Sequence, residues 1–197
     1  MIKRIRCAVV ALMLTPAIGT AQDLDAGLTA FDAGDYATAL QEWRPLAEQG
    51  DATAQVNLGL MYENGKGVPQ DYTEALRWYR VAAEQGDATA QAILAVTYDM
   101  GRGVPQDYAE ALRWYRMSAE RGDANAQYII AVMYENGRGV LQDYETAHMW
   151  FNIAGANGNS QASNYRDKLS KRMSAADISE AQSRARVCIS SGYQDCD

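Results

Sequence analysis

The stretch GDATAQVNLGLMYENGKGVPQDYTEALRWYRVAAEQ, from Gly50 to Gln85, decides the fold because the chain repeats it. The next 36 residues, Gly86 to Arg121, are identical to it at 24 positions, and Gly122 to Asn157 form a third, more divergent copy. Self-similarity at this period is typical of helical solenoids, in which each unit buries its apolar face against its neighbours. The sequence therefore predicts one elongated repeat domain.

Each copy contains two helical patterns separated by a glycine-containing turn. In the first pattern, Ala54, Leu58 and Tyr62 lie at four-residue spacing, which places them on one face of a helix. The second pattern carries a broad apolar stripe formed by Ala75, Leu76, Trp78, Tyr79 and Ala82. We therefore expect an all-α fold, a solenoid of 36-residue helix–turn–helix repeats with atypical capping units at both ends.

Aspartates mark the expected helix starts. Asp71 is followed three residues later by Glu74, and Asp107 by Glu110, which predicts a capping box at the second helix of the first two copies. In the third copy Asp143 remains but Thr146 replaces the glutamate. These signals favour the same helix boundaries as the apolar pattern.

The repeated residues resemble a known family. The pattern A-x-x-x-L-G-x-x-Y-x-x-G-x-G-V-x-x-D-x-x-x-A-x-x-W-x-x-x-A-A-x-x-G is matched by Ala54, Leu58, Gly59, Tyr62, Gly65, Gly67, Val68, Asp71, Ala75, Trp78, Ala82, Ala83 and Gly86. It is similar to the Sel1-like repeat, a relative of the tetratricopeptide repeat with a longer inter-helix loop. The resemblance covers residues 24–173 and implies a right-handed α-α superhelix that acts as a protein-interaction scaffold.

The N-terminal segment has the organisation of a secretory signal peptide. Lys3, Arg4 and Arg6 precede an apolar run, and small residues at Gly19 and Ala21 suit a cleavage site. Residues 1–21 are therefore predicted to be removed, which places the mature protein in the periplasm or outside the cell. An N-terminal membrane anchor is the alternative, but the apolar run is shorter than the ~18 residues that a span needs, so no stable membrane insertion is expected after cleavage.

Charge and cysteine content narrow the function classes. Removing residues 1–21 takes away three basic and no acidic residues, so the net charge changes from −7 to −10. A chain this acidic lacks the basic surface that nucleic acids or anionic membranes attract. Only Cys188 and Cys196 remain, and in an oxidising compartment they are expected to form a disulfide.

The units at the two ends differ from the three full repeats of residues 51–157. Residues 22–50 form a partial capping repeat, in which Pro45 is expected to bend or break the second helix. Residues 158–197 are expected to supply C-terminal capping helices and a disulfide-closed tail. The Asp177–Glu180 pair is expected to help start the last helix.

No catalytic, metal or cofactor site is predicted. The Gly-Lys-Gly and Gly-Arg-Gly turns lack the order of a phosphate-binding loop and follow helices rather than strands. His148 is the only histidine and occupies a position that is leucine in the other copies, which favours a structural role. No Ser/His/Asp set and no zinc-ligand spacing can be built around it.

The positions that vary between copies indicate a binding surface. On the first helices, spacings of four and three place three residues per unit along one stripe, which the family resemblance assigns to the concave side of the superhelix. Methionine and isoleucine mixed with asparagine suit recognition of a protein or peptide segment. The alternative is that Ile93, Ile129 and Met133 pack between units. The predicted stripe consists of Asn57, Met61, Asn64, Ile93, Thr97, Met100, Ile129, Met133 and Asn136.

Three hypotheses for the function follow. The favoured one is a non-enzymatic, exported scaffold that binds another protein in the cell envelope. The second is an envelope enzyme or ligand binder acting on peptidoglycan or β-lactams, as the resemblance to cysteine-rich members of the family suggests; those relatives pair cysteines within each repeat, and no repeat here contains one. The third is an oligomeric spacer.

Overall fold

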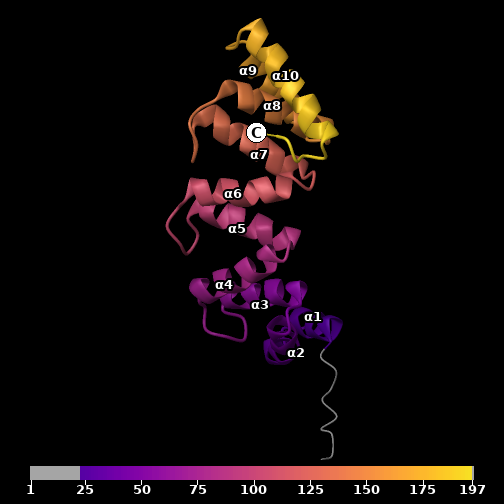
Figure 1. The fold of residues 1–197 in the computed structure, drawn as a ribbon. Helices are drawn as coiled ribbons and strands as arrows, with labels where there is room; N and C mark the ends of the chain where they lie inside the picture. Colours follow the sequence, from indigo (N-terminus) through magenta and orange to yellow (C-terminus); the bar gives the residue numbers. More distant parts are fainter. Residues whose placement is uncertain (1–22, 197) are drawn as a thin grey trace, which may run out of the picture.

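A computed structural model describes residues 23–196, and the predicted signal peptide lies outside this range. Within it the chain forms helices and no strands, stacked in order along one axis (Figure 1). The helices are α1 (Leu24–Asp32), α2 (Tyr36–Glu48), α3 (Ala52–Asn64), α4 (Tyr72–Glu84), α5 (Ala88–Met100), α6 (Tyr108–Ala119), α7 (Ala124–Asn136), α8 (Tyr144–Ala156), α9 (Ala162–Ser170) and α10 (Ala175–Ser190). The prediction of an all-α solenoid with 36-residue repeats is confirmed.

Helix boundaries follow the aspartate and glycine pattern of the sequence. Each of the first eight helices begins after an aspartate whose carboxylate accepts a backbone N–H of the first turn. The first helix of each full repeat ends at Gly65, Gly101 or Gly137, where φ lies between 64° and 67°. This left-handed conformation suits glycine and turns the chain into the long inter-helix loop.

Three local expectations are corrected by the structure. The Glu74 carboxylate binds Arg77, with an N–O distance of 2.5 Å, rather than closing a capping box with Asp71. An arginine one turn away offers a charge-assisted bond that a backbone N–H does not match. The last helix starts with a reciprocal capping box between Ser174 and Asp177, and the break that was one of the two expected effects of Pro45 is absent, because α2 continues through it.

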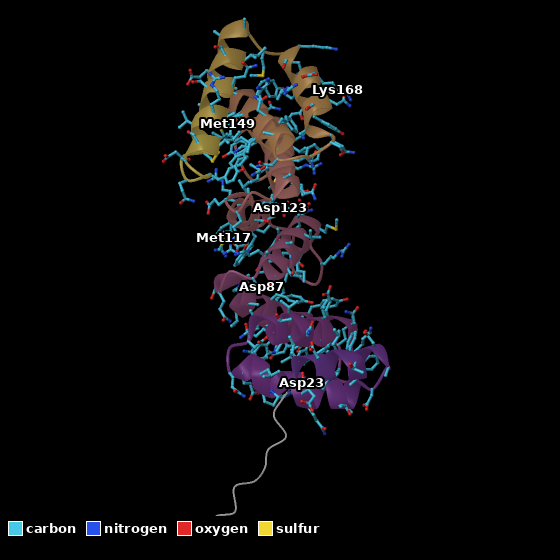
Figure 2. All side chains as sticks on the ribbon, turned by 90° about the vertical axis from the view of Figure 1, so that its right-hand side faces the viewer. Asp23, Asp87, Met117, Asp123, Met149 and Lys168 are labelled. Atoms are coloured by element: carbon cyan, nitrogen blue, oxygen red, sulfur yellow. A yellow bond between two sulfur atoms is a disulfide. The ribbon has the colours of Figure 1, made fainter. Side chains whose placement is uncertain are left out.

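From α1 to α9 each helix packs on the next one in the chain, whereas α10 packs on α8. The side chains fill the layers from Asp23 at one end to Lys168 near the other (Figure 2). The core is rich in alanine and aromatic residues; Ala90, Ala111 and Trp114 are fully buried. Small residues let the helices approach closely, while the large rings fill the space between layers. No helix within residues 23–196 is long and apolar enough to cross a membrane.

A buried glutamine joins successive units. In each full repeat a first-helix glutamine donates Nε2 to a backbone oxygen of the preceding second helix: Gln55 to Ala47, Gln91 to Ala83 and Gln127 to Ala119, each at 3.0 Å. Oε1 of Gln55 accepts from Gln85 at 2.7 Å, and that of Gln127 from Asn157 at 2.8 Å. Arg121 takes the equivalent position in the middle unit and bonds to the Gly86 oxygen instead. Consequently Oε1 of Gln91 is buried and has no hydrogen-bond partner among residues 23–196.

Replacing Arg121 should therefore stabilise the protein. The substitution Arg121→Gln supplies Gln91 with the donor that Gln85 gives Gln55, and we expect the free energy of unfolding to rise by about 1 kcal/mol. The matched control, Gln85→Arg, removes that donor from Gln55 and should lower it by a similar amount. Urea denaturation followed by circular dichroism measures both. Destabilisation by Arg121→Gln would contradict this assignment.

The C-terminal segment folds back onto the stack. A disulfide joins Cys188, which is fully buried in α10, to Cys196. The intervening tail places Tyr193 beside α8, where its hydroxyl donates to Oδ1 of Asn157 at 2.9 Å. In Figure 1 the yellow tail runs from the end of α10 back toward α7, so the described chain ends beside the stack and not at its tip.

Candidate functional site

The structure separates the nine residues of the predicted stripe into three groups. Asn64, Met100 and Asn136 are exposed, whereas Asn57, Ile93 and Ile129 are half-buried. The middle members are buried, with exposed fractions of 0% for Met61, 8% for Thr97 and 2% for Met133. The three buried side chains therefore belong to the core, as the packing alternative expected for Met133. Ile93 and Ile129 also pack against this core but keep part of their surface exposed, as Asn57 does.

On each first helix, the residue one position before the buried member of the stripe is partly exposed and takes its place on the surface. Met61 packs with Trp43 and Trp78, so the surface of α3 runs through the half-buried Leu60 instead. Leucine or valine recurs at this position in all three copies, which is the sequence signal that marks the surface. We define the first-helix face as Asn57, Leu60, Asn64, Ile93, Val96, Met100, Ile129, Val132 and Asn136.

A row of carboxylates borders the first-helix face. Glu63, Asp99 and Glu135 recur at the 36-residue period and are half-buried. Glu63 accepts a hydrogen bond from the Tyr79 hydroxyl at 2.7 Å, and burial together with this carboxylate raises the pKa of Tyr79 well above its usual value. Burial and the nearby Asp99 raise the pKa of Tyr115 to about 12. Both phenols therefore stay protonated at neutral pH, so Tyr79 keeps donating its hydroxyl hydrogen to Glu63.

Grooves open between successive first helices. A groove of about 350 Å³ is lined by Glu63 and Arg102 together with the α5 residues Ala92, Ile93, Val96 and Thr97. A smaller groove, of about 160 Å³, lies between α1 and α3 and is lined by residues that include Phe31, Asn57 and Leu60. The two grooves present apolar side chains beside a carboxylate or an amide, which suits side chains of a bound protein segment.

Aromatic residues of α7, α8 and α9 form a cluster. Tyr128 of α7 contacts Tyr165 of α9 edge-on, with ring centroids 5.4 Å apart, and both rings contact the buried Phe151. Tyr165 is 37% exposed. Burial is the main cause that raises the pKa of Tyr128 to about 12, so this phenol also stays neutral.

His148 is a structural residue in a hydrogen-bonded network. It is 1% exposed; Nδ1 lies 3.0 Å from Nδ2 of Asn152, and Nε2 lies 3.0 Å from Oγ of Ser170. Because the Asn152 amide donates to Nδ1, the bonding pattern assigns the ring proton to Nε2. Burial, followed by the charge of Arg166, lowers the pKa of His148, although Asp167 acts in the opposite direction.

Stability should consequently fall as the pH is lowered through the histidine range. The unfolded chain takes up a proton near pH 6.5, whereas the folded chain resists it, so the folded state loses stability below that pH. The variant His148→Gln should show a flatter profile between pH 7 and 5. Thermal melts across this range measure the difference. Identical slopes for the two proteins would contradict the neutral buried ring.

The described residues contain no group of metal-ligating side chains that could hold an ion. The disulfide predicted between Cys188 and Cys196 is present, and their Cα atoms are 4.6 Å apart.

Comparisons with known proteins agree with this geometry. The Sel1 repeat family profile matches residues 52–87, 88–123 and 124–159. A Sel1 repeat protein from Oxalobacter formigenes is 39% identical, with a TM-score of 0.58 over 66% of this chain and 98% of that one. A protective antigen of uropathogenic Escherichia coli with an SLR fold is 32% identical, with a TM-score of 0.70 over 87% of this chain and 38% of the antigen. A search of curated proteins found no match.

Proposed function

Because the chain belongs to the Sel1 repeat family, we propose that it is a non-enzymatic scaffold that binds another protein through its first-helix face. The observation that carries this proposal is the recurrence of the same solvent-accessible positions on α3, α5 and α7. A surface repeated at 36-residue intervals can follow an extended segment of a partner over several units.

The chemistry of the face suits a segment that combines apolar and basic side chains. Leu60, Val96 and Val132 offer apolar contact along the centre of the face. The carboxylates of Glu63 and Asp99 lie at its border and attract lysine or arginine on the partner. The contacts that specify such a segment would lie in the groove between α3 and α5, where Glu63 and Val96 line the same space.

We further propose that the scaffold works in the periplasm or outside the cell, as an adaptor or regulator in the envelope. The disulfide supports this, because such bonds form and persist in oxidising compartments. The N-terminal signal-peptide pattern of residues 1–21 supports it independently.

Partner capture tests the proposed face. The double variant Val96→Asp and Val132→Asp places carboxylates at its centre, and the matched control Val187→Asp places one on the exposed side of α10. We expect the double variant to lose at least tenfold in the recovery of the partner that copurifies with the wild-type protein, and the control to keep it. Circular dichroism checks that the variants fold. Equal recovery by all three proteins would reject the first-helix face as the binding surface.

A further inference from the structure

The second-helix side of the stack carries a groove that repeats with the units. Each copy lies where one second helix ends, a glycine turn follows, and the next second helix passes alongside. The three turns contain Gly50, Gly86 and Gly122, all with positive φ. We call the grooves beside these glycines the first, second and third groove, in that order. The structure fills the three equivalent grooves differently.

The third groove holds a tyrosine of the chain's own tail. The Tyr193 ring lies against Gly122, 3.4 Å from the position that a Cβ atom would take there, and its hydroxyl donates to Oδ1 of Asn157. Nδ2 of the same Asn157 donates to Gln127. The space that remains, lined by residues including Glu120 and Tyr193, is only about 40 Å³. The tail therefore acts as an intramolecular ligand of this groove.

The second groove is covered by Arg121. Its guanidinium donates to the Gly86 oxygen and lies over that glycine. Arg121 stands at the position of Asn157 in the third unit. In the second groove, the amide that would accept a tyrosine hydroxyl is therefore replaced by the Arg121 guanidinium, which occupies the groove itself.

The first groove is open. Among the described residues, no atom beyond the chain neighbours lies within 4 Å of a Cβ placed on Gly50, and the space beside it is about 630 Å³. Gln85 stands at the position of Asn157 and, like it, donates inward, to Gln55. Its Oε1 accepts no hydrogen bond from the described residues, so it can receive a hydroxyl as Asn157 does. The groove is lined by Ala47, Glu48, Gly50, Gln55, Arg77, Trp78, Val81, Glu84 and Gln85.

The charges at the first groove favour a cationic ligand. Glu48 and Glu84 line it, whereas the one cation of the lining, Arg77, is paired with Glu74 and stacked on Trp78, 4.1 Å from the ring centroid. Helices α2 and α4 both end here, at Glu48 and Glu84, and the free carbonyl groups of helix C-termini add negative potential. The tail of a second copy, Gly-Tyr-Gln-Asp-Cys-Asp, is acidic and would be repelled.

We propose that the first groove binds a tyrosine of a partner protein, in a segment that carries lysine or arginine beside it. The phenol ring lies over Gly50 and against Val81, its hydroxyl donates to Oε1 of Gln85, and the flanking cations face Glu48 and Glu84. This site does not rest on the first-helix face, because it is built from second helices and the turn after α2.

Short peptides test the proposal. The probe is acetyl-Gly-Lys-Tyr-Gln-Lys-Gly-amide, compared with versions that carry phenylalanine for tyrosine or aspartate for both lysines. Titration followed by backbone amide NMR should show one site with shifts at Gly50, Val81 and Gln85. The phenylalanine peptide should bind about fivefold more weakly, because one hydrogen bond is lost. The aspartate peptide should bind more weakly still, and salt should weaken binding of the lysine peptide.

Two variants give the test its controls. Val81→Arg fills the first groove and should abolish binding. Arg121→Gln uncovers the second groove and provides the amide that Gln85 provides in the first, so the stoichiometry should rise from one peptide to two. Absence of binding, or shifts confined to the first-helix face, would overturn the proposal. Equal affinity for the aspartate peptide would also overturn it and would indicate tail-mediated self-association instead.

Discussion

The variant Leu94→Ala is expected to lower the free energy of unfolding by about 3 kcal/mol. Leu94 is fully buried in α5, in the core that joins the second repeat to its neighbours. Truncating a buried leucine removes its transfer free energy and leaves a cavity, which together cost about 2–5 kcal/mol. Because a solenoid is held together by contacts between adjacent units, weakening the middle one should also broaden the unfolding transition.

The matched control is Leu141→Ala. This variant makes the same leucine-to-alanine change in the loop before α8, where the Leu141 side chain is 91% exposed. We expect its effect to stay within about 0.5 kcal/mol. Urea denaturation of both variants gives the comparison, and similar losses at the two positions would contradict the assigned packing of α5.

Loss of the disulfide is expected to destabilise the C-terminal unit by about 2–3 kcal/mol. Cys188 and Cys196 are eight residues apart, so the bond closes a short loop, and the loop-closure estimate for that length lies in this range. The double variant Cys188→Ala and Cys196→Ala should expose the amides of the tail to hydrogen exchange and release Tyr193 from its groove. The effect should concentrate at α10 and the tail.

Reduction of the wild-type protein provides the control for this experiment. A reductant should produce the same loss of protection in the wild-type protein and no further change in the double variant. Uniform destabilisation of all repeats would indicate that the bond supports the whole stack rather than its end. No change in either protein would show that the tail is held by Tyr193 and Asn157 alone.

The fold could be predicted because the repeat makes each local signal visible three times. Aspartate caps, glycine turns and four-residue apolar spacing coincide in every copy, so errors at one position are corrected by the others. The exact cap partner was less predictable: Glu74 has both a backbone N–H and Arg77 within one turn, and only the folded geometry chooses between them.

Three members of the predicted stripe, Met61, Thr97 and Met133, are buried in the structure. Neighbouring residues on a helix point about 100° apart, and Leu60 and Met61 are both apolar, so sequence periodicity cannot decide which of them faces α2 and α4. The structure decides it, because Met61 lies in the same buried cluster as Trp43 and Trp78. Similarly, the occupied groove at Gly122 depends on a tail that lies outside the repeat and returns to it.

Site-specific photocrosslinking tests the central claim, that the first-helix face binds a protein, most directly. A photoreactive residue is placed at Val96 on the face, and at Leu141 in the exposed loop as a control, in cells that produce the protein. We predict one discrete crosslinked partner from position 96, lost when Val132→Asp is added, and none from position 141. Equal or absent crosslinking at the two positions, in a protein that folds normally, would contradict the assignment of this face as the interaction surface.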